Sequence, residues 1–416
     1  MLNLICFFYL RAFKFPYCGC RLDSMKINKR ILFSGHSQQD KSASDELLQS
    51  IDDWWSAFRD NCNEIVSFFE GRSSLVLPEF MHDHLGAVDE RLMWEFGPAA
   101  KGQGHRLVVT PEANAFLRPL VNLLIERAPD IKGWEFYPYR LPEDAKDAIS
   151  FVEQRTGTNI GPWKVLVSKG QFNLVCLTYI APGAEIEPAF IATETILGEE
   201  VLDKWIGCIE AQPLAAAKDD GVIVPILGLN SAVDKMVSEI KQQVAKEPFT
   251  QRVSSLQWAT FQCDPNVAPE FVKQRDLVVG VTADVGVYSA ANGPARFYSE
   301  RFSQAGELFC FVCVEDKSPI SEEKLYFKTE LDDALGEALF DSGSGCVIGS
   351  GTGLEHLYLD LALVENNKGV ELVRRVLSSR GVPKSTWILF YDSTLEAEWI
   401  GIYEDTPPPM SFLPQS

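Results

Sequence analysis

Hydrophobic and polar positions follow two different periods along this chain, and the change from one to the other marks the elements that we predict. Between residues 45 and 70 the apolar side chains recur at helical spacing, which places them on one face of a long helix. Ser44 suits the N-cap of this helix and Gly71 suits its end. A second helix is predicted over residues 79–90. The apolar face of the long helix consists of Ile51, Trp54, Trp55, Phe58, Cys62, Ile65 and Phe69.

A second pattern then occurs three times: two short strands joined by a turn, a helix, and a closing strand. The three occurrences cover residues 91–140, 163–212 and 346–392, and a partial one, with a helix predicted over 294–304, covers 277–314. Each turn carries glycine, proline or lysine–glycine signals that are typical of hairpins. Because an isolated hairpin is not stable in water, we expect the following helix to cover its apolar face and the closing strand to join the sheet beside the hairpin.

This pattern predicts an α+β fold of repeated β-hairpin–helix–strand units, in a ferredoxin-like or related sandwich with two domains. The alternative that remains open is a mixed α/β sheet. The polar run at residues 241–252 suggests the domain border. We predict a disordered or wrongly annotated N-terminal extension over 1–43, a first α+β domain over 44–245, a second over 250–405, and a proline-rich tail over 406–416.

A further helix is predicted from residue 319 to about residue 338. Its apolar stripe is predicted to consist of Leu325, Leu331, Leu335 and Leu339. Ser321 and Lys324 have the spacing of a Ser-x-x-Lys nucleophile motif, in which the lysine helps to deprotonate the serine. The partner motifs of the enzymes that use this pair are absent from the sequence, so we expect Ser321 in the first turn of the helix instead.

Composition narrows the class of protein. Hydrophobic residues make up 46% of the 416 residues and charged residues 23%, which are values of a globular chain. The net charge of −20 argues against nucleic-acid binding, which needs clustered lysine and arginine. It favours, if anything, a basic protein partner. The sequence does not indicate an oligomeric state.

The cysteines and the N-terminus bear on the compartment. The ten cysteines are scattered, several within apolar runs, which is typical of reduced, buried thiols rather than a disulfide framework. The apolar run at residues 2–10 is too short to span a bilayer and lacks a cleavage site. We therefore predict a cytoplasmic protein without membrane association, whose true start is Met1 or Met25.

The stretch from Trp54 to Arg140 resembles a group of uncharacterised bacterial cytosolic proteins. The shared features are a tryptophan-rich helix, a Phe-Glu-Phe-like strand, a hairpin, and an Ala-Pro…Trp exit into the closing strand. They are represented here by Trp54, Trp55, Phe58, Trp94, Glu95, Phe96, Ala128, Pro129 and Trp134. The resemblance covers about a fifth of the chain. It implies an α+β domain, and it implies no activity and no functional residues.

Two groups of polar residues are candidate binding sites. In the first occurrence of the unit the candidates are Glu95, His105, Arg106 and Arg140, and in the third they are Glu355, His356 and Asp360. Each group lies on neighbouring strands and combines an imidazole with carboxylates, which is the composition of a polar site. Salt-bridged surface residues are the alternative explanation.

Other motifs point to no metal or cofactor. The glycine-rich segment 343–353 precedes a strand rather than a helix, so we interpret it as a hairpin turn and not as a phosphate loop. His82 and His84 diverge on a helix, and Cys310 and Cys313 point to opposite faces of a strand. No catalytic residues are assigned.

The function favoured by these features is that of a non-enzymatic binding or regulatory protein, inhibitor-like or immunity-like, acting through a protein partner. The alternative is a hydrolase with a histidine and a carboxylate in a cleft between domains. The positions of His105 and His356 distinguish the binding protein from the hydrolase. A histidine within hydrogen-bond reach of a carboxylate in a deep pocket would favour the enzyme.

Overall fold

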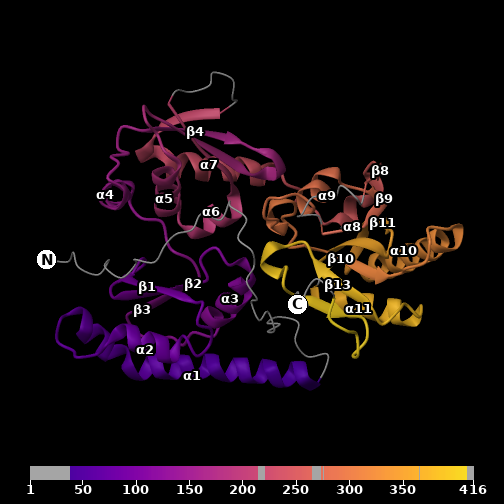
Figure 1. The fold of residues 1–416 in the computed structure, drawn as a ribbon, viewed down its shortest axis with the longest axis horizontal. Coiled ribbons are helices and arrows are strands. Elements are labelled where there is room, and N and C mark those ends of the chain that lie inside the picture. Colours follow the sequence, from indigo (N-terminus) through magenta and orange to yellow (C-terminus); the bar gives the residue numbers. More distant parts are fainter. Residues whose placement is uncertain (1–37, 214–220, 265–272, 275, 365, 410–416) are drawn as a thin grey trace. The chain divides into compact units, whose positions relative to one another are not determined.

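The chain divides into two compact units, which we describe separately (Figure 1). The computed structural model describes residues 38–213, 221–264, 273, 274, 276–364 and 366–409. The described part of the first unit ends at Arg140, and the second runs from Leu141 to Pro409. The domain border predicted at 245–250 falls inside the second unit, between its two sheets. Most of the predicted N-terminal extension and of the proline-rich tail lies outside the described residues.

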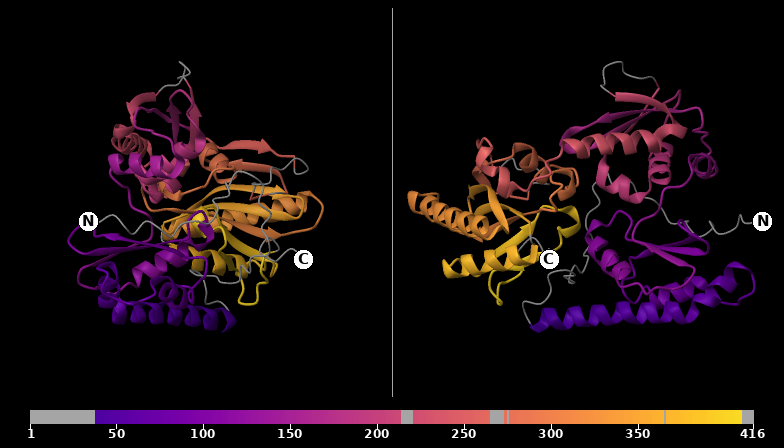
Figure 2. Two further views of the ribbon diagram at one scale, coloured as in Figure 1. Left: turned by 60° about the vertical axis from the view of Figure 1, so that its left-hand side comes forward. Right: turned by 180° about the vertical axis from the view of Figure 1, so that it is seen from behind.

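The first unit is a three-stranded sheet packed on helices. Its elements are α1 (Gln38–Phe69), α2 (Leu77–His84), β1 (Met93–Pro98), β2 (His105–Thr110), α3 (Arg118–Glu126) and β3 (Trp134–Tyr137). The strand order is β1-β2-β3, with an antiparallel hairpin and a parallel closing strand. Helix α1 lies along one face of the sheet (Figures 1 and 2). It begins upstream of the predicted start, and α2 ends at His84, earlier than predicted.

Aromatic residues form the core of the first unit. Phe58 of α1 is fully buried, with its ring centroid 5.0 Å from that of Trp134 and 5.6 Å from that of Phe136. The Trp55 indole N–H donates to the carbonyl of Leu124 at 2.8 Å, which ties α1 to α3. The apolar face predicted for the long helix is therefore the one that contacts the sheet.

The second unit begins with a four-stranded sheet. The elements are α4 (Ala145–Thr156), β4 (Lys164–Lys169), β5 (Val175–Ile180), α5 (Ile186–Leu197), α6 (Glu199–Trp205), β6 (Ile206–Gln212), β7 (Gly221–Pro225) and α7 (Leu229–Gln243). The strand order is β6-β5-β4-β7. Inward side chains of β4 and β5 pack against α4, α5 and α7 in one apolar core.

A seven-stranded sheet completes the second unit. Its elements are α8 (Phe249–Arg252), β8 (Ala259–Gln262), β9 (Leu277–Thr282), α9 (Val285–Ala291), β10 (Leu308–Glu315), α10 (Glu322–Ser342), β11 (Gly345–Gly353), β12 (His356–Leu363), α11 (Asn366–Ser379), β13 (Thr386–Phe390) and β14 (Trp399–Gly401). The order β14-β13-β10-β12-β11-β9-β8 is antiparallel throughout. Helices α10 and α11 pack against each other beside this sheet (Figure 1).

The glycine-rich segment was predicted to be a hairpin turn; the hairpin is present, because β11 pairs antiparallel with β12, but the turn was placed too early in the chain. Four of its glycines lie within strand β11, and the turn follows Gly353. A Cβ at Gly349 would lie 2.6 Å from Asp360 Oδ2, and one at Gly351 would lie 2.3 Å from a methyl carbon of Leu277. These glycines therefore allow close packing inside the sheet rather than a change of chain direction.

Two further expectations need correction. The helix predicted over 294–304 is absent from the described structure there, where only Ser299–Arg301 form a 3₁₀ turn, and the nearest helix is α9. The closing strand of the third occurrence, β13, does not lie beside its own hairpin, because β10 is inserted between β12 and β13. The described chain is thus a mixed α+β structure with sheets of three, four and seven strands. None of its described helices has the length and apolar character needed to cross a bilayer.

Candidate functional site

Of the four polar residues predicted as a site in the first occurrence of the pattern, Glu95, Arg106 and Arg140 come together. Arg106 Nη2 lies 3.5 Å from Glu95 Oε1, and Arg140 Nε lies 3.7 Å from Glu95 Oε2. Arg140 also donates to Glu112 at 2.7 Å. His105 is not part of the group. It neighbours Arg106 along β2, so its side chain points to the opposite face of the sheet.

The position of His105 explains why it cannot join the charged residues. Its ring centroid lies 5.4 Å from that of Phe69 and 5.2 Å from that of Trp134, in the aromatic layer between the sheet and α1. The charges of Glu95 and Arg140 are balanced within their own cluster at the edge of solvent. Pairs of this kind contribute about 0–1 kcal/mol each. We assign no chemistry to this group.

The three residues predicted in the third occurrence of the hairpin–helix–strand pattern, Glu355, His356 and Asp360, separate into two groups. His356 Nδ1 lies 3.2 Å from Asp276 Oδ2, and the backbone N–H of Glu355 donates to the same oxygen at 2.6 Å. The hydroxyl of Tyr358 donates to Asp276 Oδ1. Burial works against the charge of Asp276, but the hydrogen bonds from His356, Tyr358 and Glu355 outweigh it and hold its pKa at about 2. Asp276 was not foreseen.

Asp360 belongs to a separate, buried network. Its Oδ1 accepts hydrogen bonds from Gln274 Nε2 and from the Tyr391 hydroxyl, each at 2.6 Å. Burial raises the pKa of Asp360 to about 6, although the hydrogen bonds from Tyr391 and Gln274 act in the opposite direction. Gly349 leaves room for the second oxygen. A cavity of about 10 Å³ beside Asp360 is close to the smallest volume that can hold one water.

The Ser-x-x-Lys pair is structural. Ser321 caps α10, where its hydroxyl accepts from the backbone N–H of Lys324 at 3.2 Å. The ammonium of Lys324 is buried and donates to the carbonyls of Asp316 at 2.7 Å and Ser318 at 3.0 Å. The lysine is therefore bound to the loop before the helix, and Ser321 lies at the N-cap, one residue before the first turn in which it was expected.

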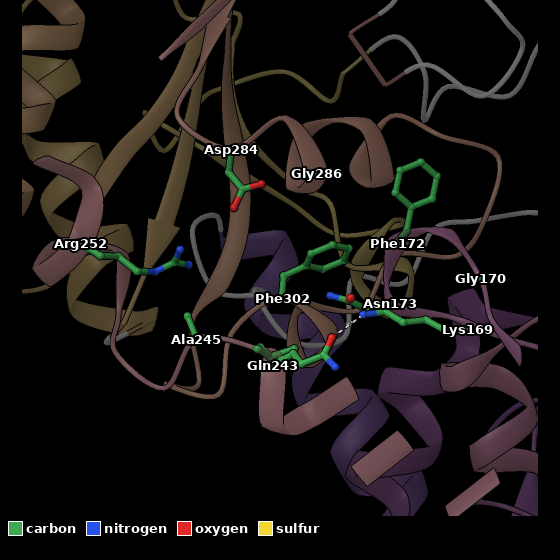
Figure 3. A pocket seen from close by; sticks show the side chains of 11 residues that line it. Lys169, Gly170, Phe172, Asn173, Gln243, Ala245, Arg252, Asp284, Gly286 and Phe302 are labelled. Carbon is green, nitrogen blue, oxygen red and sulfur yellow. Dashed lines mark hydrogen bonds between the residues drawn. The ribbon is translucent and has the colours of Figure 1, made fainter. Parts of the chain in front are cut away.

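A pocket that the sequence did not reveal lies in the second unit, where its four-stranded part meets its seven-stranded part (Figure 3). It has a volume of about 380 Å³, which is within the range of small-molecule sites. The lining residues are Lys169, Gly170, Phe172, Asn173, Gln243, Val244, Ala245, Arg252, Asp284, Gly286 and Phe302.

One wall of the pocket is a strained turn between β4 and β5. Phe172 and Asn173 adopt left-handed conformations, with φ of 56° and 59°, which non-glycine residues rarely adopt. Asn173 Nδ2 donates to the carbonyl of Arg301 at 2.7 Å, so this turn is held by the opposite half of the unit. Strain of this kind is often found at binding sites and needs surrounding contacts to persist.

The charges of the pocket are two cations and one carboxylate. Lys169 Nζ donates to Gln243 Oε1 at 2.7 Å, and Asp284 caps α9 by accepting from the N–H of Val287 at 3.0 Å. The guanidinium of Arg252 forms no hydrogen bond or ion pair with any residue that the structure describes, and its Nε is buried. Arg252 and Asp284 extend toward the same space in Figure 3.

Phe302 provides an aromatic surface in the same pocket. Its ring is stacked on that of Phe297, with the centroids 5.0 Å apart and the planes 3° apart. Arg252 in turn lies over the ring of Phe249, with its guanidinium carbon 3.5 Å from the ring centroid. Phe302 and Arg252 are thus held in place by aromatic neighbours. Binding of a ligand to them would cost less side-chain conformational entropy than binding to two mobile side chains.

Local sequence signals mark only fragments of this pocket. The Lys169-Gly170-Gln171 turn and the polar run ending at Arg252 are visible in the sequence, but as a hairpin and a border. Their meeting depends on packing between segments that are far apart along the chain.

Comparison with known proteins adds no assignment to this geometry. No family model, no curated protein and no solved structure matches the chain.

Proposed function

We propose that this chain is a non-enzymatic binding or regulatory protein whose second unit binds a small organic anion in the pocket around Arg252. The observation that carries this proposal is the guanidinium of Arg252, which lines the pocket, has its Nε buried and has no hydrogen-bond acceptor among the described residues. Arg252 is half-buried and lies over the ring of Phe249, so an anionic ligand would supply the hydrogen-bond acceptor that its buried Nε lacks. The planar guanidinium suits a carboxylate, which it can bind through two parallel hydrogen bonds.

The other lining residues restrict the ligand further. The ring of Phe302 favours a planar, apolar body, because aromatic faces stack on such groups. Asp284 disfavours a second negative charge and can accept a hydrogen bond from a hydroxyl or amine on the ligand. The ligand class is therefore a planar monoanion that carries a hydrogen-bond donor away from its charge.

The anion proposal predicts selective binding of 4-hydroxybenzoate, a probe with these three features, over its uncharged methyl ester. The Arg252→Gln variant should bind the acid about 10- to 100-fold more weakly and lose most of the preference for it, since a hydrogen bond to a charged group is worth about 1.5–3 kcal/mol. Isothermal titration calorimetry would measure the dissociation constants.

The matched control is Arg375→Gln, which removes an exposed arginine from α11 outside the pocket. It should leave the affinity unchanged. If the acid fails to bind at 10 mM, or if the two arginine variants weaken it equally, the proposed anion site is wrong.

A second candidate function, binding of a protein partner, is favoured by strand β7. It is the last strand of its sheet among the described residues, and it pairs on one side only, with β4. Val222 is 54% exposed and Ile223 is 49% exposed. Such an edge can accept a strand from another chain. The net charge of −20 favours a basic partner.

The edge proposal predicts that Ile223→Lys abolishes capture of a basic partner from host lysate at low salt. Tyr326→Lys is the control, because it adds the same charge at an exposed aromatic residue of α10. A basic protein that wild type and Tyr326→Lys retain, that Ile223→Lys loses and that salt elutes would support the edge. Equal capture of the same proteins by both variants would contradict it. Mass spectrometry of the eluates provides the readout.

The hydrolase alternative is less favoured by the geometry. His356 is within hydrogen-bond reach of Asp276, but neither residue lines the pocket. The hydroxyl next to them, that of Tyr358, donates to the carboxylate rather than to the imidazole. An activated nucleophile needs a base that accepts its proton.

For the architecture, we propose that the hairpin–helix–strand units are related and ferredoxin-like. The supporting observation is that β1-β2-β3 and β4-β5-β6 share an antiparallel hairpin followed by a parallel closing strand. We also propose a cytoplasmic location, which fits the free cysteines among the described residues.

A further inference from the structure

Two cysteines of the four-stranded sheet lie directly opposite each other. Cys176 on β5 and Cys208 on β6 are partners in the register of two neighbouring parallel strands. Because Val175 and Leu177 point into the helix-covered core, Cys176 points to the other face of the sheet. Neither cysteine is in a disulfide in this structure, and both are half-buried.

The spacing of neighbouring strands suits a covalent link. Adjacent strands lie about 4.7–4.9 Å apart, and the Cα atoms of a disulfide lie about 4.4–6.8 Å apart. Burial, and then the neighbouring Cys176 and Glu210, raise the pKa of the Cys208 thiol to about 12. Cys310 and Cys313 provide a contrast, since both are buried on one strand three positions apart.

We propose that Cys176 and Cys208 are a redox-sensitive pair that a peroxide converts reversibly to a disulfide. One thiolate attacks a peroxide oxygen, the O–O bond breaks, hydroxide leaves, and a sulfenic acid forms. The second thiol attacks the sulfenic sulfur, an S–S bond forms and water is released. Overall, two thiols and one hydrogen peroxide give one disulfide and two waters. Two electrons pass from sulfur to oxygen.

The environment makes this a slow reaction at neutral pH. The thiolate is the reacting form, and the raised pKa of Cys208 keeps that thiol protonated. The rate should therefore increase by up to about tenfold per pH unit between pH 7 and 9, with the thiolate fraction. A thiol reductant should restore the pair, because a thiolate attacks and opens the disulfide.

The pair also contacts the turn that forms the pocket. A Cβ at Gly170 would lie 2.7 Å from Cys176 Sγ, so the sulfur packs directly on this glycine, which lines the pocket. Disulfide formation draws that sulfur toward β6 and away from the turn. A change in affinity for 4-hydroxybenzoate on oxidation would rest on the proposed anion site, whereas formation of the disulfide does not.

Peptide mapping of the full chain tests the pair. After treatment with hydrogen peroxide, alkylation of the remaining thiols and digestion with trypsin, peptides 170–204 and 205–218 should be recovered linked to each other. Dithiothreitol should separate them. The exposed Cys263 should be recovered without a disulfide partner in the same digest, which makes it the internal control.

The variant Cys208→Ser should give no linked peptides. Phenylarsine oxide, which bridges neighbouring thiols, provides a second measurement on the unmodified chain. It should protect Cys176 and Cys208 from alkylation and block the linkage. Oxidation of the exposed Cys263 at pH 9 shows that the peroxide has reacted with the protein. If Cys176 and Cys208 are still alkylated, and therefore still reduced, once that oxidation is complete, the proposal is overturned. It is also overturned if Cys176 links to other cysteines as often as to Cys208.

Discussion

Replacing Leu335 by alanine should lower the free energy of unfolding of the second unit by about 2–5 kcal/mol, because it leaves a cavity in a packed core. Leu335 of α10 is fully buried, and Leu331 and Leu339, one turn away on each side, are buried with it. The helix is in contact with strand β11. Urea denaturation followed by circular dichroism measures the change.

The same helix contains its own control. Leu325 is 41% exposed, so Leu325→Ala should change the free energy of unfolding by less than about 1 kcal/mol. Both variants remove the same atoms and place alanine in the same helix. Losses of similar size would mean that α10 does not pack through Leu335, and would contradict the orientation of this helix.

The second large effect concerns the buried carboxyl of Asp360, whose pKa is raised to about 6. Between about pH 4 and 6 the folded protein keeps a proton that the unfolded chain has lost. The resulting stabilisation is fully present below about pH 4 and is lost as the pH rises through 6. For a fully buried group a shift of this size corresponds to about 2–3 kcal/mol.

The variant Asp360→Asn removes this titration while keeping an oxygen that can accept from Gln274 and Tyr391. The free energy of unfolding of the variant minus that of wild type should therefore increase by about 2–3 kcal/mol between pH 4 and 7. Urea titrations at each pH provide the measurement. A difference that stays constant over this range would show that Asp360 is not held protonated by its surroundings.

Asp276→Asn is the matched control, because this carboxyl has the opposite shift. The pKa of Asp276 is lowered to about 2, so its contribution is present above about pH 4 and is lost only as the pH falls toward 2. The titration of the Asp276 carboxyl itself should therefore add no change to the difference between this variant and wild type from pH 4 to 7. The two variants separate a buried acid from one that is held ionised by its hydrogen bonds.

Helix α10 shows how far periodicity alone reaches. The spacing of Leu331, Leu335 and Leu339 identifies the buried face correctly. The prediction that Leu325 continues this face is wrong, because the buried position two turns before Leu331 is occupied by Lys324. A lysine does not register as a core residue in a hydrophobic pattern. Only the loop carbonyls that accept its hydrogen bonds make that burial possible.

In the candidate sites, too, local spacing predicts the face on which a residue lies but not the residues that it contacts. Alternation along β2 and β12 determines that Arg106 and His105 face opposite ways and that His356 and Asp360 share a face. It does not supply their partners, because Asp276 lies 80 residues from His356, and Gln274 lies 86 residues from Asp360. The alternation of side chains along a strand determines which face of the sheet each residue occupies. Its contacts with distant segments depend on which strands are neighbours in the sheet.

The sequence by itself determined that this chain forms amphipathic helices and hairpins in an α+β arrangement, and that Phe58 lies on the apolar face of the long helix, because those features follow from local spacing of apolar residues. The tertiary structure alone decided that β10 enters between β12 and β13. It alone placed Arg252 beside the β4–β5 turn and set Cys208 against Cys176. Strand order and the meeting of distant loops depend on long-range packing, which leaves no periodic trace in the residues that come together.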